Sequence, residues 1–271
     1  MSGERRIMAH MVAYFPDRAA SRQVARGLVD GGCAYLEIQF PFSDPTADGP
    51  DIQAACTEAL AAGFTIQEGF RLVSEIRQES PSPIFLMSYA NLLFTHGIDR
   101  FLARCAECGV AGVIVPDLPP DYDEGLFGAA RAHGLHAVPV LSPSMREERL
   151  MRIAKLHPEY VYATLRTGTT GPLTRIDEVG IAFLERVKTL CSDPPAKVLG
   201  GFGISTSAQV AGVAGHAHAV IVGSALVREV AKGGDPYASV LGKMRELVLD
   251  REVEAGQAQG GAKARRSLRA D

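Results

Sequence analysis

Short hydrophobic runs rich in β-branched residues recur along the chain, and segments with helical spacing separate them. An apolar run of four to eight residues between turn signals is typical of a buried strand. On this pattern we predict eight strands, at residues 8–14, 34–40, 83–89, 112–116, 136–142, 160–165, 197–201 and 218–223.

The segments between these strands carry the spacing of helices. Ala20, Val24 and Leu28 recur every fourth residue, and two glycines end that pattern. Thr65 and Glu68 have the spacing of a capping box, in which each side chain bonds a backbone N–H of the other. The chain is therefore expected to alternate strand and helix throughout.

Eight alternating units over about 240 residues predict an α/β fold, a (β/α)8 TIM barrel. A doubly wound sheet is the alternative, but it rarely uses eight uninterrupted units without a second domain. We expect one barrel domain over residues 1–251 and a disordered tail over residues 252–271, which are rich in Gly, Ala and charge. A basic docking tail is the other interpretation, on Lys263, Arg265, Arg266 and Arg269.

Charge and cysteine content narrow the classes of function. A net charge of −3 argues against a nucleic-acid or membrane-surface protein, because such proteins need basic patches. No apolar run reaches the roughly 18 residues of a membrane span, and the first ten residues lack the apolar core of a signal peptide. Together with an odd count of 5 cysteines, this predicts a reduced cytoplasmic protein.

Two short motifs could suggest metal or redox chemistry, and we favour neither. Cys105 and Cys108 form a CxxC pair, but they close a helical pattern, whereas redox pairs usually open one. His216 and His218 have no third ligand in view. We predict no metal site.

The second predicted strand contains an acid. Its alternation places Leu36 and Ile38 toward the helices, and Tyr35, Glu37 and Gln39 toward the barrel axis. Active sites of such barrels lie at the carboxyl ends of the strands, so Glu37 would face the barrel mouth. It is either a proton-transfer group or a structural carboxylate bonded to other barrel side chains.

The loop after that strand holds two more acids of interest. Asp44 and Asp48 are common turn formers, since Asp side chains bond nearby backbone N–H groups. One of them could nevertheless complete a two-carboxylate site with Glu37.

Three glycine-containing loops follow the last three predicted strands. They read "RTGTTG", "GGFGIS" and "VGSAL". Glycines let backbone N–H groups approach a ligand closely, and barrels commonly bind phosphate after strands seven and eight. The residues alone therefore predict a phosphate-anchored small substrate facing one or two carboxylates.

At this point the stretch "LEIQFPFSDPTADGPDIQ" closely resembles the signature of the tryptophan synthase alpha subunit family. The similarity continues, in family order, through "MSYANLLFTHGIDRF", "GVIVPDLPP", "RTGTTG", "GFGIST" and "VIVGSA". It covers residues 8–232, which is nearly all of the predicted barrel.

The resemblance implies a retro-aldol cleavage of indole-3-glycerol phosphate to indole and glyceraldehyde 3-phosphate, without a cofactor in this chain. Glu37 matches the family's catalytic glutamate, which protonates C3 of the indole and assists deprotonation of the glycerol hydroxyl. Asp48 matches the catalytic aspartate, which accepts the indole N–H.

Further site residues are also implied by the resemblance alone. It places Tyr162 against the substrate, Arg166 and Thr170 on a closing loop, and Asp44 and Asp117 at loop or partner positions. The phosphate-binding positions that it implies are Gly171, Gly203, Gly223 and Ser224. The implied partner is a beta subunit that uses pyridoxal phosphate, within an α₂β₂ complex.

The chain also departs from the family pattern. Gln39 stands where the family usually has Gly, and we expect it to bond Glu37 or to crowd the substrate. Only seven residues precede the first predicted strand, so the helix that usually caps the barrel bottom should be missing. Two alternative functions stay open: a regulatory partner with little activity of its own, and a free-standing lyase.

Overall fold

The computed structural model describes residues 5–165 and 178–248, and its centre is one parallel sheet. The order of strands in the sheet is β5-β4-β3-β2-β1-β9-β8-β7-β6. The strands are β1 (Ile7–Val12), β2 (Tyr35–Gln39), β3 (Ile84–Met87), β4 (Gly112–Ile114), β5 (His136–Val138), β6 (Val140–Leu141), β7 (Tyr160–Thr164), β8 (Lys197–Gly201) and β9 (Ala219–Val222).

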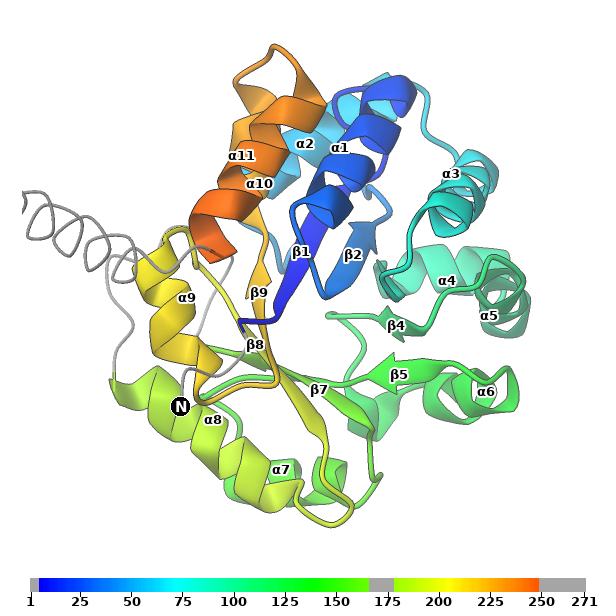
Figure 1. Ribbon diagram of the computed structural model, residues 1–271. Coiled ribbons are helices and arrows are strands. Elements are labelled where there is room, and N and C mark those ends of the chain that lie inside the picture. The colour runs from blue at the N-terminus through cyan, green and yellow to red at the C-terminus, as the bar shows by residue number, and fades with distance from the viewer. Residues whose placement is uncertain (1–4, 166–177, 249–271) are drawn as a thin grey trace, which may run out of the picture.

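Helices connect the successive strands, except β5 and β6, and form an outer layer around the sheet (Figure 1). This arrangement confirms the predicted (β/α)8 barrel. Within the described residues only Arg5 and Arg6 precede β1, and residues 1–4 lie outside them. The helices are α1 (Arg18–Asp30), α2 (Pro50–Ala61), α3 (Ile66–Glu79), α4 (Ala90–His96), α5 (Ile98–Glu107), η1 (Pro120–Tyr122), α6 (Leu126–Ala132), α7 (Glu147–Ala154), α8 (Glu178–Leu190), α9 (Ser207–Ala214), α10 (Ser224–Ala231) and α11 (Pro236–Val248).

The fifth predicted strand, over residues 136–142, is two strands in the structure. Pro139 separates β5 from β6 because it has no N–H to give to a sheet ladder, although its carbonyl still accepts from the N–H of Tyr162 at 2.9 Å. These two strands are the ends of the sheet order and are consecutive in sequence. The barrel is therefore nearly closed, and its one break lies inside a single predicted strand.

An aromatic cluster fills the barrel near the amino ends of its strands. The rings of Tyr35, Phe85 and Tyr160 meet edge to face, with centroids 5.0 to 6.0 Å apart. Such pairs bury large apolar surface with favourable geometry. This packing fills the barrel at the amino ends of these strands.

The predicted capping box before α3 forms only in part. The Thr65 hydroxyl accepts from the N–H of Glu68 at 3.2 Å, as expected. The Glu68 carboxylate does not return to Thr65 but accepts from the hydroxyl of Tyr14 at 3.2 Å and pairs with arginines. A tertiary contact has thus replaced half of the local motif.

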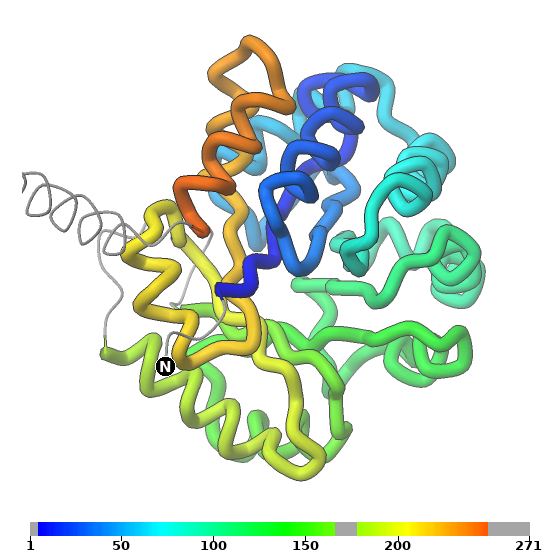
Figure 2. Tube along the Cα trace, in the orientation of Figure 1, coloured from blue at the N-terminus to red at the C-terminus, as the bar shows by residue number. Residues whose placement is uncertain are grey.

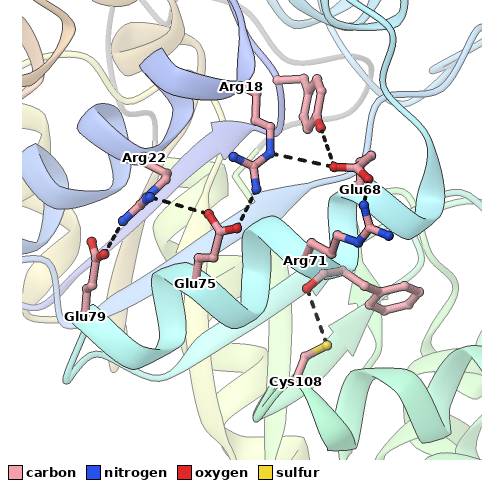
Figure 3. A network of polar contacts seen from close by, with 9 residues as sticks. Arg18, Arg22, Glu68, Arg71, Glu75, Glu79 and Cys108 are labelled. Carbon is pink, nitrogen blue, oxygen red and sulfur yellow. Dashed lines mark hydrogen bonds and ion pairs between the residues drawn. The ribbon is translucent and has the colours of Figure 1, made fainter.

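Those arginines belong to a network that joins α1 to α3 (Figure 3). Arg18 pairs with Glu75 and lies 3.7 Å from Glu68, while Arg22 pairs with Glu79. Most of these side chains are partly exposed, and exposed ion pairs are worth about 0–1 kcal/mol each. The network aligns the two helices more than it stabilises the fold.

The two ends of the barrel domain pack against each other. Among the described residues α1 is the first helix and α11 the last, and the two lie side by side in Figures 1 and 2. A Cβ added at Gly27 of α1 would lie 2.6 Å from both the Tyr237 carbonyl oxygen and the Val240 Cγ2 of α11. Gly27 is therefore required for this close approach of the two helices.

We expect Gly27→Ala to destabilise the protein by about 1–3 kcal/mol, because overpacking forces rigid backbone apart. Gly242→Ala in α11 is the matched control, since a Cβ there meets no atom within 4 Å. That control should be neutral or stabilise by up to about 1 kcal/mol, through the higher helix propensity of Ala. Urea unfolding of both variants measures the difference, and equal midpoints would contradict the packing argument.

The motifs that we set aside as metal or redox sites have other partners. Cys105 is buried in α5 and the Cys108 sulfur lies 3.5 Å from the Phe70 carbonyl oxygen. His216 pairs with Glu185 at 2.7 Å, and His218 bonds the Tyr35 hydroxyl at 2.8 Å. Within residues 5–165 and 178–248, no group of three or more His, Cys, Asp or Glu side chains could hold a metal ion.

Across the same described ranges, none of the helices has both the length and the apolar character needed to cross a membrane. The predicted tail at residues 252–271 lies outside the described residues.

Candidate functional site

A cavity of about 380 Å³ opens at the carboxyl ends of the strands, above the aromatic cluster. Polar groups lie on one part of its wall and apolar side chains cover the rest. Its lining residues are His10, Glu37, Thr46, Ala47, Asp48, Ile52, Met87, Ile114, Pro116, Val140, Ser142, Ser144, Met145, Tyr162, Thr164, Phe202, Gly203, Ile221, Gly223 and Ser224. An enclosed, largely apolar space with a few converging polar groups is the usual form of a small-molecule site.

Glu37 reaches this cavity from β2 and is only 3 % exposed. The parallel register of β1 and β2 sets His10 beside Glu37, and the His10 Nδ1 lies 3.4 Å from the Glu37 Oε2. A buried carboxylate is costly unless another group compensates it, and His10 is its ion-pair partner here, although the Glu37 Oε2 has no hydrogen-bond partner among the described residues.

Asp48 lies in the loop between β2 and α2 and is also 3 % exposed. Its Oδ2 accepts two hydrogen bonds of 2.8 Å, one from the Gln39 Nε2 and one from the Tyr89 hydroxyl. Burial raises the pKa of the Asp48 carboxyl, although His10, Tyr89 and Gln39 act in the opposite direction. The two donors hold one oxygen, which leaves the other oxygen free to meet a ligand.

We expected Gln39 to bond Glu37 or to crowd the substrate, and the structure shows neither contact. It is fully buried, it is not part of the cavity lining, and it donates to Asp48 instead of Glu37. The reason is the path of the loop, which turns Asp48 back over the end of β2. Gln39 therefore neither crowds the cavity nor bonds Glu37, and it supports the second acid of the site.

Two aromatic rings form part of the apolar wall. Tyr162 of β7 and Phe202 after β8 meet edge to face, with ring centroids 6.1 Å apart. Burial holds the pKa of the Tyr162 hydroxyl well above its usual value, and the nearby carboxylates of Glu37 and Asp48 add to this effect. Tyr162 is therefore neutral at any ordinary pH.

The two glycine loops after β8 and β9 reach the same cavity. Gly203 has a φ of +78° and the preceding Phe202 a φ of +125°, so this loop turns sharply into the site. Gly223 precedes the first turn of α10, whose first residue is Ser224. The first N–H groups of a helix have no partner within the helix and favour an anion.

The predicted site residues divide into three groups. Six of them line the cavity: Glu37, Asp48, Tyr162, Gly203, Gly223 and Ser224. Asp44 and Asp117 do not. Asp44 is exposed, and the Asp117 carboxylate accepts from the N–H of Ala90 at 2.9 Å, which ties the loop after β4 to the start of α4. Arg166, Thr170 and Gly171 lie outside the described residues.

Sequence reasoning missed three residues at this site. His10 is a lone polar residue inside the hydrophobic first strand, and its inward phase was a signal that we did not use. Tyr89 lies two residues after the end of β3, and Phe202 lies within a loop that we had singled out only for its glycines. For Tyr89 and Phe202 the signal was their position just after the carboxyl end of a strand.

Comparisons with known proteins all lead to one family. The family sequence model described as tryptophan synthase alpha chain matches residues 2–256. The tryptophan synthase alpha chain of Helicobacter hepaticus is 36% identical over 232 residues, which are 83% of this chain and 86% of that protein.

Solved structures agree with the sequence comparison. The tryptophan synthase of Mycobacterium tuberculosis superposes with a TM-score of 0.83 at 30% identity, over 90% of this chain and 91% of that chain. The tryptophan synthase complex of Pyrococcus furiosus superposes with a TM-score of 0.82 at 32% identity, over 92% and 99% of the two chains.

Proposed function

This chain belongs to the tryptophan synthase alpha chain family, and we propose on that premise that Glu37 and Asp48 carry its reaction in the cavity described above. The family's reaction is the retro-aldol cleavage of indole-3-glycerol phosphate to indole and glyceraldehyde 3-phosphate, in tryptophan biosynthesis. The chain is accordingly a lyase of the alpha reaction. The observation that carries the site proposal is two buried carboxylates in one cavity with the amino end of α10.

Glu37 moves the proton of the reaction. Its carboxyl gives a proton to C3 of the indole ring, and the carboxylate left behind takes the proton of the glycerol hydroxyl as the carbon–carbon bond breaks. One proton moves from the hydroxyl to C3 and none is left over. Its buried position excludes water, which would otherwise compete for this proton.

Asp48 stabilises the positive charge that develops on the indole ring during the reaction. Protonation at C3 makes the ring positive, and a carboxylate that accepts the indole N–H stabilises that cation. The bonds from Gln39 and Tyr89 fix Asp48 before the substrate arrives, so no reorganisation is needed when the charge develops. Two carboxyl groups with different partners can thus have different tasks.

The remaining lining groups fit the two ends of the substrate. Tyr162 and Phe202 offer an apolar, aromatic wall to the indole ring. Gly203, Gly223 and Ser224 offer backbone N–H groups and a hydroxyl to the phosphate. Arg166, Thr170 and Gly171 stay a prediction from the resemblance, for a loop that closes over the site.

We also propose a partner, a beta subunit that carries pyridoxal phosphate, within an α₂β₂ complex in the cytoplasm. The alpha reaction itself proceeds by proton transfer between side chains and substrate, so this chain needs no cofactor of its own. The structure from Pyrococcus furiosus is described as a tryptophan synthase complex, which supports association with a second chain. Asp44 and Asp117, on loops beside the cavity mouth, are the positions that we assign to the contact between subunits.

Indole release from indole-3-glycerol phosphate, measured with and without the beta subunit, tests this proposal. We expect indole release by the chain alone and faster release in the complex, together with co-elution of the two chains. No release under either condition would leave only the regulatory interpretation. Full activity without any association would favour the free-standing lyase.

A further inference from the structure

His10 is the one polar residue in β1, and it lies between two parts of the site. On one side the register of β1 and β2 sets it beside Glu37. On the other side is the loop after β9, where a Cβ added at Gly223 would lie 3.6 Å from the His10 Cβ and Cγ. The ring is 4 % exposed and lines the cavity.

The contacts of the ring are not those of a packing residue. The Nδ1 lies 3.4 Å from the Glu37 Oε2 as an ion pair. Neither the Nε2 nor that Oε2 has a hydrogen-bond partner among the described residues. A histidine buried for structural reasons usually has both nitrogens bonded, because an unpaired polar atom is costly to bury. The ion-pair partner of His10 is Glu37, the proposed proton carrier.

The charges around His10 favour its protonated form. Burial opposes the imidazolium, but the carboxylates of Glu37 and Asp48 outweigh it, so the pKa of His10 is raised. The helices α1, α2 and α10 also pack against β1. Asp51 of α2 pairs with Arg228 of α10 at 2.6 Å, and the arginines of α1 pair with Glu75, Glu79 and Asp30. The groups that face the ring are Glu37 from β2, Asp48 from the loop before α2, the neutral Tyr162 from β7, and the uncharged Gly223 and Ser224 after β9.

We propose that His10 is a positioning residue that forms a pair with Glu37. Between turnovers this pair holds the proton that Glu37 gives to C3 of the indole. Before C–C cleavage the proton passes from the His10 Nδ1 to the Glu37 Oε2, and Glu37 then gives it to C3 of the indole. After Glu37 has taken the hydroxyl proton, that proton returns to Nδ1. Each transfer breaks one N–H or O–H bond and forms one new bond, and the pair ends as it began.

This inference rests on the proposed role of Glu37, and two variants of the full chain test it in the presence of the beta subunit. His10→Asn can place an N–H near the position of Nδ1 but holds no titratable proton. We expect its kcat to fall by about 10- to 100-fold with little change in KM. The alkaline limb of its kcat profile should move to lower pH, because the imidazolium whose pKa is raised in the parent chain is no longer present to hold the proton.

A matched control and a chemical rescue make the test specific. His218→Asn removes a histidine bonded to Tyr35 at the other end of the barrel and should leave the pH profile unchanged. His10→Ala leaves a gap open to the cavity, which added imidazole should fill and reactivate. Pyrazole has the same ring size but is not protonated at neutral pH, so it should not reactivate His10→Ala. Equal rescue by both rings would reduce His10 to a packing residue and overturn the proposal.

A titration of His10 by NMR gives a readout that does not depend on turnover. In Glu37→Gln the pKa of His10 should fall, since the carboxylate that favours the imidazolium is gone. An unchanged His10 titration would overturn the pairing. The two proposals fail separately: turnover that persists in Glu37→Gln rejects the role of Glu37, whereas an inactive Glu37→Gln with a fully active His10→Asn rejects only that of His10.

Discussion

Glu37→Gln should lower indole release from indole-3-glycerol phosphate by about 10²- to 10⁴-fold, the usual contribution of a general acid–base group. The amide has nearly the shape of the carboxyl but can neither give nor take the proton that C3 and the glycerol hydroxyl require. Loss should appear in kcat and in kcat/KM alike, since the interaction is made only in the transition state. Steady-state kinetics with the beta subunit present measure both constants.

The fold should survive this substitution, which keeps the effect interpretable. Glu37 is buried and lies 3.4 Å from His10, but neither the aromatic cluster nor a helix cap depends on its charge. The unfolding midpoint of Glu37→Gln should therefore stay near that of the parent chain. Near-normal turnover in a folded Glu37→Gln would refute the assignment of Glu37.

Asp48→Asn should lower kcat by about 10²- to 10³-fold, as the loss of a preorganised charge does in other enzymes. An amide cannot carry the negative charge that stabilises a positive indole ring. It would also turn its own donors toward the hydroxyl of Tyr89 and the amide of Gln39, which now both donate to the Asp48 Oδ2 at 2.8 Å. Binding of the phosphate end should change little, so KM for the substrate should stay within a few-fold.

Gln39→Leu is the matched control for Asp48→Asn, because it keeps the acid and removes one of its two donors. The bond from Gln39 lowers the pKa of Asp48, so its loss should raise that pKa further. A required carboxylate is lost as the pH falls through its pKa, and the acidic limb of the rate profile should therefore move to higher pH. An unchanged limb would show that Gln39 has no part in fixing Asp48.

The structure also accounts for a departure from the family pattern. Gln39, in place of the usual glycine, lies away from the cavity and fills buried space between Asp48 and Cys56. The amide nitrogen of Gln39 donates to one partner from the loop and one from α2, whereas its Oε1 has no hydrogen-bond partner among the described residues. The regulatory interpretation, in which Gln39 spoils the site, thus loses its physical basis.

Much of this protein was determined by the sequence alone. The alternation of apolar runs and helical spacing predicted the barrel, since strands buried on both faces need hydrophobic residues almost throughout. The positions of Glu37, Asp48, Gly203, Gly223 and Ser224, in or just after predicted strands, indicated one site, because the carboxyl ends of all barrel strands lie at the same end. These features depend on local pattern and on a single rule of topology.

Only the tertiary structure decided which of these groups touch. His10 and Glu37 are 27 positions apart and meet through the register of β1 and β2, which the hydrophobic pattern does not give. Gln39 and Tyr89 converge on Asp48 because the loop after β2 turns back over the strand ends. Hydrogen-bond partners depend on distances of a few tenths of an ångström, and residue order alone does not determine such distances between separate segments.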